Sequence, residues 1–441
     1  MTRPALRDLH PEQGVRAEIG NIGAIEGLRG LALLWVIAFH YYVLRNAKFD
    51  DPWIALVNAF HPLKVIVANG YLGVDLFFLI TGFLLTLPWF RHALEGRAAP
   101  SARDFYIRRV RRIVPAYYVQ LALLFLLFTP LLLGYEFIRY NFYYYVYNIG
   151  AHATFLHYTT PISSASMQLN GALWTLALEF QYYLLLPLFA PWFVRAPWRT
   201  AVAFVVAATA WRWLATYGMD GLVAFEANAG KQWNLPESVL RNLIATQLPG
   251  YLAHFAIGVV VGRSWLLMRP RVPEAGEALA WMILVAVGLG SVYGFHAWGL
   301  GPGDLGWLVI PAGLGIAMFG AVSRAPAVAR VLLANPPLVF VGRVSYSAYL
   351  YHLPLLLVLN KYAPSEGSWL AFPAYLTGVL AFAWLSFRFV EQPYMHSRKP
   401  AKDPTWPSNA APGASEAPST STTTTASGAA PSTTIASSSN S

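Results

Sequence analysis

The sequence predicts an all-α membrane protein that crosses the bilayer about ten times. Its 441 residues are 56% hydrophobic and only 12% charged, and the mean hydropathy is +0.45. Apolar runs of about 20 residues, the length that a helix needs to span the hydrocarbon core, recur along the chain. This combination excludes an ordinary soluble domain, which carries about twice this share of charged residues.

The apolar runs define the expected elements in order. They lie at about 25–44, 70–90, 113–133, 171–194, 199–217, 246–265, 277–296, 305–322, 337–359 and 369–389. Residues 25–395 are therefore expected to form one transmembrane domain, preceded by a polar segment at 1–24. No small-residue cleavage site follows the first run, so we expect it to remain as a helix rather than act as a signal peptide.

The 31 Lys and Arg residues predict the orientation. Most of them precede the first span or fall in alternate segments after it, at 91–112, 195–199, 263–271, 324–330 and 398–402. Positive residues collect on the cytoplasmic side, so we expect both termini in the cytoplasm. The net charge of +10 then reports membrane topology and does not indicate a nucleic-acid partner.

Two segments outside the spans have a distinctive composition. Residues 134–170 include the aromatic run RYNFYYYVYN and are expected on the outer side, either at the membrane interface or lining a mouth. Residues 396–441 are rich in Ser, Thr, Ala and Pro and carry few large apolar side chains. Such a composition buries too little apolar surface to offset chain entropy, so a disordered cytoplasmic tail is expected.

Ionisable side chains within the spans predict a functional site, because they are costly in a bilayer. Arg29 and His40 lie eleven residues apart, so they share a helix face and are separated by about 16 Å along the axis. In the expected orientation Arg29 lies near the inner end and His40 in the outer half. Asp75, Glu179 and His352 come from three other spans and are placed in the outer half too. We therefore expect these four outer residues to converge at one catalytic site.

Each of these residues also has a structural interpretation. Arg29 can pair with Glu26 one helical turn away, and Asp75 can offset the dipole at a helix start. A buried histidine can simply bridge two helices. The loop ARDFYIRRVRRIVPAYY suits either anionic lipid or a phosphorylated ligand, through five arginines: Arg103, Arg108, Arg109, Arg111 and Arg112.

Six segments, in this order, resemble the acyltransferase family 3 membrane proteins. They are LRGLALLWVIAFH, GVDLFFLITGF, RRVRRIVP, LWTLALEFQYYLLLPL, VSYSAYLYH and FVEQP, within residues 25–395. The resemblance implies ten transmembrane helices, a bacterial plasma membrane, and transfer of an acyl group, usually acetyl from acetyl-CoA, to a hydroxyl of a carbohydrate or related acceptor. It also implies that Arg29 and His40 are the family's paired first-helix residues and that Arg109, Arg112 and their neighbours meet the CoA phosphates. Thr81 stands where the family commonly has serine, and the hydrolase-like domain that some relatives append is not expected.

Acyl transfer requires a base for the acceptor hydroxyl or a nucleophile that carries the acyl group. The chain has no cysteine, which excludes a thiol nucleophile. The hypothesis is that His40 is the general base and that Asp75 or Glu179 fixes its tautomer. A covalent acyl-histidine is the mechanistic rival. The histidines lack metal-binding spacing, so no metal or permanently bound cofactor is expected, and acyl-CoA enters as a substrate.

A second class of function remains open at this stage. Intramembrane Asp, Glu, His and Arg also build relays in proton-coupled transporters, and LLLPLF and LVIPAGLG have the composition of broken transport helices. A scaffold for envelope enzymes needs no buried carboxylates. The acceptor also stays open among polysaccharide, peptidoglycan, glycolipid and secreted metabolite.

Overall fold

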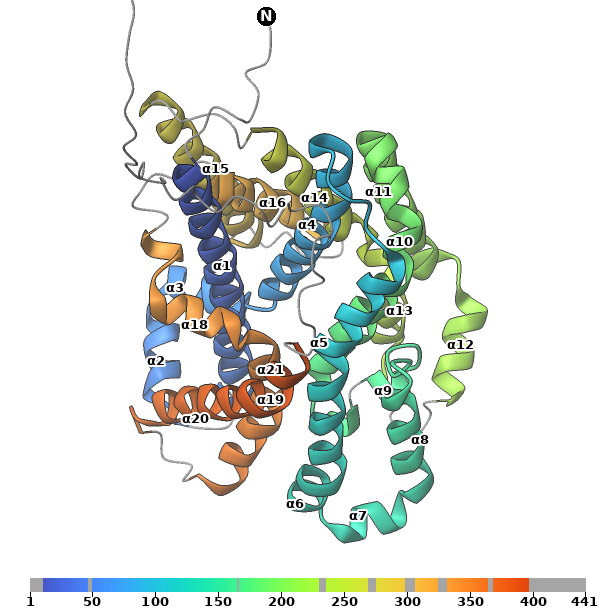
Figure 1. The fold of residues 1–441 in the computed structure, drawn as a ribbon. Coiled ribbons are helices and arrows are strands. Elements are labelled where there is room, and N and C mark those ends of the chain that lie inside the picture. Colours follow the sequence, from blue (N-terminus) through green and yellow to red (C-terminus); the bar gives the residue numbers. More distant parts are fainter. Residues whose placement is uncertain are drawn as a thin grey trace, which may run out of the picture. The chain divides into compact units, whose positions relative to one another are not determined.

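The described part of the chain is helical. The computed structural model describes residues 11–46, 50–164, 166–229, 235–268, 275–297, 306–323, 331–363 and 368–395, and no β-strand occurs in these ranges (Figure 1). The all-α prediction is therefore confirmed. The tail predicted at 396–441 lies outside the described residues.

Long helices alternate with short ones along the chain. The long helices are α1 (Pro11–Arg45), α4 (Leu72–Glu95), α5 (Ala102–Leu123), α10 (Trp174–Arg195), α11 (Pro197–Tyr217), α14 (Leu248–Met268), α15 (Ala275–Ala297), α16 (Trp307–Ser323), α19 (Ser345–Tyr362) and α20 (Ala371–Ser386). The shorter helices are α2 (Pro52–Ala59), α3 (His61–Ala68), α6 (Thr129–Leu133), α7 (Tyr135–Tyr140), α8 (Phe142–Ala153), α9 (Pro161–Ser164), α12 (Asp220–Ala229), α13 (Glu237–Ala245), α18 (Pro336–Arg343) and α21 (Gln392–Met395).

Six helical segments of the described chain are long and apolar enough to cross a membrane. They are Gly23–Arg45, Leu72–Glu95, Ala102–Leu133, Gly171–Arg195, Leu248–Met268 and Ala371–Met395. A multi-pass membrane protein is therefore supported. The other four predicted spans are helical but are not among these six, so the count of ten stays a prediction.

The third span begins earlier than the apolar run indicates. The sequence predicts a loop through the arginines up to residue 112, but α5 begins at Ala102, and the Ser101 hydroxyl caps it by accepting a hydrogen bond from the Asp104 N–H at 3.3 Å. The helix then continues through a π-helical turn at Leu124–Phe128 into α6. The arginine run is therefore helical, and its side chains point in different directions.

The span predicted at 337–359 is two helices. α18 ends at Arg343 and α19 begins at Ser345, and next to this break α18 crosses α1 so closely that a Cβ on Gly342 would lie 1.9 Å from the Glu26 carbonyl oxygen. The breaks expected in LLLPLF and LVIPAGLG do not occur, since α10 continues past Pro187 and α16 continues past Pro311. This observation removes one of the two sequence arguments for a transporter, the broken helices, and leaves the intramembrane ionisable residues.

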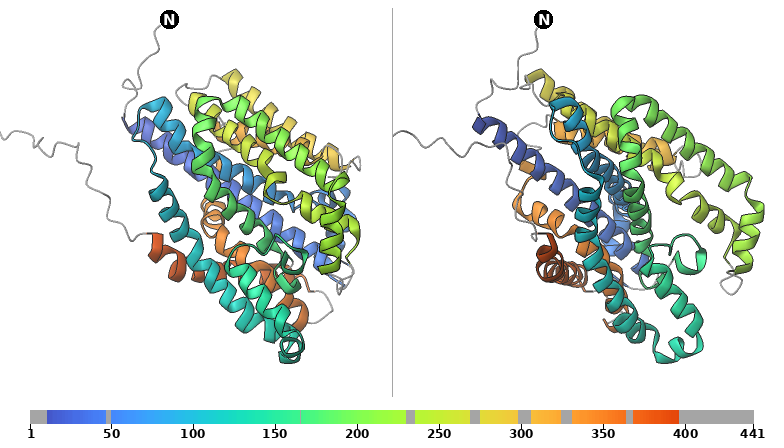
Figure 2. Two further views of the ribbon diagram at one scale, coloured as in Figure 1. Left: turned by 90° about the vertical axis from the view of Figure 1, so that its right-hand side faces the viewer. Right: turned by 45° about the vertical axis from the view of Figure 1, so that its right-hand side comes forward.

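α1 and α4 form the centre of the described fold (Figure 2). α1 packs against α4, α18 and α19, and α4 also packs against α10, α14 and α16. Close contact of α4 with α14 requires glycine, because a Cβ on Gly82 would lie 2.3 Å from the Phe255 carbonyl oxygen. Small residues at such crossings are the usual way in which membrane helices pack without a large apolar driving force.

The aromatic segment 134–170 is mostly helical. α7 and α8 follow the third span and are joined by a bend (Figure 1). The C-terminal end of the segment leads into α10. Tyr135 and Tyr143 are 78% and 88% exposed, whereas Tyr158 and Gln168 line a cavity. The segment therefore combines the two roles that its sequence left open, since aromatic rings face outward and polar groups line a mouth.

Candidate active site

Two cavities lie along α1 and α4 and meet at shared walls. The smaller one, of about 310 Å³, is lined by Arg29, and the larger one, of about 1220 Å³, is lined by His40. Val74 on α4 and Tyr349 on α19 line both. The two residues of the first helix that the sequence singles out therefore face two adjoining spaces.

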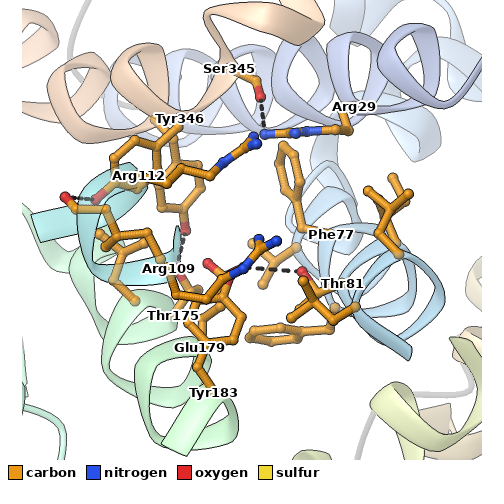
Figure 3. A pocket seen from close by; sticks show the side chains of 18 residues that line it. Arg29, Phe77, Thr81, Arg109, Arg112, Thr175, Glu179, Tyr183, Ser345 and Tyr346 are labelled. Carbon is orange, nitrogen blue, oxygen red and sulfur yellow. Dashed lines mark hydrogen bonds between the residues drawn. The ribbon is translucent and has the colours of Figure 1, made fainter. Parts of the chain in front are cut away.

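The smaller cavity, here called the arginine cavity, collects guanidinium groups from two helices (Figure 3). Arg29 enters from α1, and one of its terminal nitrogens donates to the Ser345 hydroxyl at 3.0 Å. Arg109 and Arg112 enter from α5. Arg29 does not form the predicted pair with Glu26, whose Oε2 atom is buried without a hydrogen-bond partner among the described residues.

Helix periodicity selects two arginines from the basic run. Arg109 and Arg112 are three residues apart, so they share a face of α5 and line the cavity. Arg108 is exposed, and neither it nor Arg111 lines either cavity. The expectation that all these arginines meet one ligand assumed a flexible loop, and the helical backbone prevents it.

The guanidinium of Arg109 is poorly satisfied by the protein. Its Nε atom is buried and has no hydrogen-bond partner among the described residues, and its guanidinium carbon lies 5.7 Å from the Phe105 ring and 5.9 Å from the Tyr183 ring. A buried donor without an acceptor costs free energy. An anionic ligand would supply the missing acceptor.

Glu179 lies in the arginine cavity and does not converge with His40. Its Oε1 atom accepts hydrogen bonds from the Thr81 hydroxyl at 3.0 Å and from the Tyr183 hydroxyl. The residue at 81 therefore uses its hydroxyl, which serine would also provide. The position of Glu179 along α10 predicts a depth equal to that of His40, but it does not specify which way the side chain points. The sequence-based grouping of Glu179 with His40 is wrong for that reason.

The larger cavity, here called the aromatic cavity, has a different lining. His40 and Asp75 face it together with polar side chains and many aromatic rings, among them Tyr71, Tyr158, Trp174, Trp213, Tyr217, Tyr251 and Trp307. Pockets of this size and mixed character are typical of organic-ligand sites.

His40 is hydrogen-bonded to a second histidine. Its Nδ1 atom lies 2.9 Å from the Val36 carbonyl oxygen and 3.2 Å from Nε2 of His352, whose Nδ1 atom lies 2.7 Å from the Tyr349 carbonyl oxygen. Carbonyls only accept, so with both rings neutral each Nδ1 carries the proton and donates it. Nε2 of His40 then keeps its lone pair.

The expected carboxylate partner of His40 is replaced by His352. Among the described residues neither Asp75 nor Glu179 contacts His40. Asp75 instead lies 3.2 Å from Nε2 of His254 on α14, a residue that sequence reasoning missed. The signal was available, because His254 also interrupts an apolar run in LPGYLAHFAIGVVVG.

Within the described ranges, no group of three or more His, Asp or Glu side chains is arranged to hold a metal ion. The polar groups of the two cavities are thus arranged as hydrogen-bonding pairs from neighbouring helices.

Comparison with known proteins agrees with this arrangement. A family model described as an acyltransferase domain, Acyl_transf_3, matches residues 22–388. The chain belongs to acyltransferase family 3. The match includes α1, α4, α5, α10 and α19, which supply both cavities. No solved structure matches.

Several curated proteins are similar to this member of acyltransferase family 3. Nodulation protein 10 of Rhizobium leguminosarum bv. viciae is 28% identical over 337 residues, covering 74% of this chain and 82% of that protein. Peptidoglycan O-acetyltransferase OatA of Listeria monocytogenes is 24% identical over 401 residues, covering 84% and 55%. Putative O-acetyltransferase SACOL0978 of Staphylococcus aureus is 24% identical over 393 residues, covering 85% and 57%. The chain thus spans little more than half the length of these two O-acetyltransferases, and family and relatives together support an O-acyltransferase enzyme.

Proposed function

We propose that the protein transfers an acyl group, in the first instance acetyl, from cytosolic acyl-CoA to a hydroxyl of a cell-envelope carbohydrate or secreted metabolite. The observation that carries this proposal is the pair of adjoining cavities, one lined by guanidinium groups and the other by His40. A bisubstrate transfer needs two such spaces that meet at the reacting atoms. The proposed location is a bacterial plasma membrane, with both termini in the cytoplasm.

The donor is assigned to the arginine cavity. Three guanidinium groups and one carboxylate line it, and guanidinium forks match phosphate oxygens. The cavity extends along α4 from Leu85 to Val74, eleven residues that rise about 16 Å. We place the CoA phosphates at the arginines and the thioester near Val74 and Tyr349. Anionic lipid remains an additional partner for the exposed arginines of α5.

The acceptor is assigned to the aromatic cavity. In the proposed step Nε2 of His40 accepts the proton of the acceptor hydroxyl, and that oxygen attacks the thioester carbonyl carbon. The carbon–sulfur bond then breaks, and the CoA thiolate takes the proton from His40. His352 acts as the positioning residue, because it keeps the His40 proton on Nδ1.

The test follows labelled acetyl-CoA supplied to the cytoplasmic face of inverted membrane vesicles. We expect His40→Ala to abolish transfer and keep donor binding, while His61→Ala, at an exposed histidine, retains both. We expect Arg109→Ala to raise the donor KM at least about tenfold, as loss of a charge-assisted hydrogen bond predicts. Arg103→Ala, at an exposed arginine of the same helix, is the matched control.

Two results would overturn the proposal. One is full transfer by His40→Ala at normal protein level, and the other is an equal donor KM for Arg109→Ala and Arg103→Ala. Label that stays covalently attached to wild-type protein without acceptor, and not to His40→Ala, would replace direct attack by an acyl-histidine intermediate.

A further inference from the structure

Arg212 on α11 is the cation of the aromatic cavity that is not in direct contact with a carboxylate among the described residues. Its Nε atom donates to the Gly250 carbonyl oxygen at 3.0 Å. Among the described residues it forms no ion pair within 4 Å, although its guanidinium hydrogen-bonds the Tyr251 side chain and interacts with Asp75 at longer range. If α11 crosses the membrane as predicted, a guanidinium at the wall of such a cavity is costly and favours a role in ligand binding.

Two aromatic rings hold this guanidinium in place. Its central carbon lies 5.5 Å from the Tyr251 ring and 5.1 Å from the Trp307 ring. Both contacts are within the range of cation–π attraction. Gly250 uses Nε and the Tyr251 side chain is a further hydrogen-bond partner, so the remaining N–H groups of the two terminal nitrogens are those that would donate to a carboxylate or phosphate.

The other charged groups of the cavity are already paired. Arg241 forms ion pairs with Asp220 at 2.5 Å and Glu237 at 2.7 Å. Asp75 is the acidic residue in the lining, and it contacts His254. Arg212 is therefore the cation of this lining that no carboxylate among the described residues contacts directly, with Asp75 acting on it only at longer range.

We propose that Arg212 binds an anionic group of the acceptor, so that the preferred substrates are acidic carbohydrates bearing a carboxylate or a phosphate. The inference rests on the proposed function, since it specifies the acceptor of that same site. The cavity volume of about 1220 Å³ leaves room for more than one sugar ring beside the anion. Arg212 is thereby a specificity-determining residue that does not take part in proton transfer.

The first test measures binding without any acyl donor. The purified full chain is titrated with methyl glucuronoside, glucose 6-phosphate and neutral methyl glucoside, and tryptophan fluorescence reports occupancy, because Trp174, Trp213 and Trp307 line the cavity. We expect at least about tenfold tighter binding of one or both anions, the effect of one charge-assisted contact. The comparison of carboxylate with phosphate identifies the group that is preferred.

Variants assign this preference to Arg212. We expect Arg212→Gln to lose the preference, Arg212→Lys to keep part of it, and Arg199→Gln, at an exposed arginine of the same helix, to behave as wild type. Equal binding of neutral and anionic probes by wild type, absence of binding by all three, or an unchanged preference in Arg212→Gln would overturn the inference. None of these results bears on acyl transfer by His40, which is measured separately with labelled acetyl-CoA.

Discussion

The histidine pair shows how the reactive nitrogen is defined by its neighbours. Tyr349 supplies a carbonyl that fixes the His352 tautomer, and His352 with Val36 then fixes that of His40. The two groups that accept the His40 Nδ1 proton, the Val36 carbonyl and the His352 ring, are both neutral in this arrangement. The His352 ring also packs against Tyr349, at 5.3 Å between ring centroids, so the pair is joined to the wall between the two cavities.

Removing the acceptor nitrogen of His352 is expected to lower turnover. His352→Phe retains a ring but leaves the Val36 carbonyl as the remaining acceptor for the His40 Nδ1 proton, so the ring is held less firmly, and we expect kcat to fall by about 100-fold, at the lower end of what a general base contributes. The donor KM is expected to stay unchanged, because His352 lies outside the lining of the arginine cavity. Transfer kinetics in vesicles measure both constants.

His352→Gln is the informative companion variant, since its side-chain oxygen can accept the His40 proton where Nε2 did. We expect it to recover most of the lost kcat. A His352→Phe enzyme with wild-type kcat, or a glutamine variant as impaired as phenylalanine, would contradict the positioning role.

The candidate residues were predictable individually, but their partners were not. His40 and His352 interrupt apolar runs, so hydropathy alone marks them. The partner of each depends on how its helix is rotated and which helix lies beside it, and neither quantity can be obtained from one sequence. For this reason the sequence leaves the carboxylate partner of His40 open between Asp75 and Glu179, whereas Asp75 contacts His254 in the structure.

At the scale of elements, α19 connects the parts of the site. Ser345 accepts from Arg29, Tyr349 lines both cavities, and His352 holds His40, all within about two turns of one helix. Hydropathy predicted the apolar stretch but not the start of α19 at Ser345. That break lies beside the crossing of α18 over α1 at Gly342, a tertiary contact that hydropathy does not report.

The last turn of α8 and the turn that follows it contain a buried histidine pair between two spans. His152 and His157 stack at 4.2 Å between ring centroids, and both are fully buried. Burial lowers the pKa of His157 to about 4 and the pKa of His152 well below its ordinary value, with His157 adding repulsion. His157 donates from Nε2 to the Leu173 carbonyl oxygen at 2.9 Å and so attaches this turn to the start of α10.

These lowered pKa values predict acid sensitivity of folding. In the unfolded chain His157 binds a proton below pH 6.5, whereas in the folded protein it does so only below about pH 4. The contribution of neutral His157 to the free energy of unfolding is therefore fully present above pH 6.5 and is lost as the pH falls from 6.5 to about 4. His157 alone would cost roughly 2 kcal/mol of unfolding free energy by pH 5. We expect the unfolding temperature in detergent to fall between pH 7 and pH 5.

Substituting the histidine tests the cause. His157→Gln keeps a donor for Leu173 without a titrating ring, so its unfolding temperature is expected to fall less steeply with acidity. His61→Gln, at an exposed position, is expected to retain the wild-type slope. Identical slopes for wild type and His157→Gln would show that acid acts elsewhere in the molecule.

At the scale of the whole transmembrane domain, two helices connect the two cavities. α1 carries Arg29 and His40, while α4 carries Thr81 and Asp75, each pair split between the arginine cavity and the aromatic cavity. A hydrophilic donor and an acceptor on opposite sides of a bilayer can then meet without either crossing it. This advantage exists only if the cavities open to opposite sides, which makes topology the decisive property of the molecule.

Single cysteines determine that topology, because the natural chain has none to interfere. In intact cells, Arg139→Cys and Asn228→Cys are expected to react with a membrane-impermeant maleimide, whereas Arg97→Cys and Arg199→Cys react only in inverted vesicles; all four positions are exposed. Positions 199 and 228 lie on either side of α11 and test whether this helix crosses the membrane, because α11 is one of the predicted spans that hydropathy leaves unconfirmed. Labelling of positions 199 and 228 from the same side would show that α11 does not cross, and the number of membrane spans would then be lower than the predicted ten. Labelling of position 97 from outside would invert the orientation and place the arginine cavity away from cytosolic acyl-CoA, which would remove the physical basis for the assigned donor.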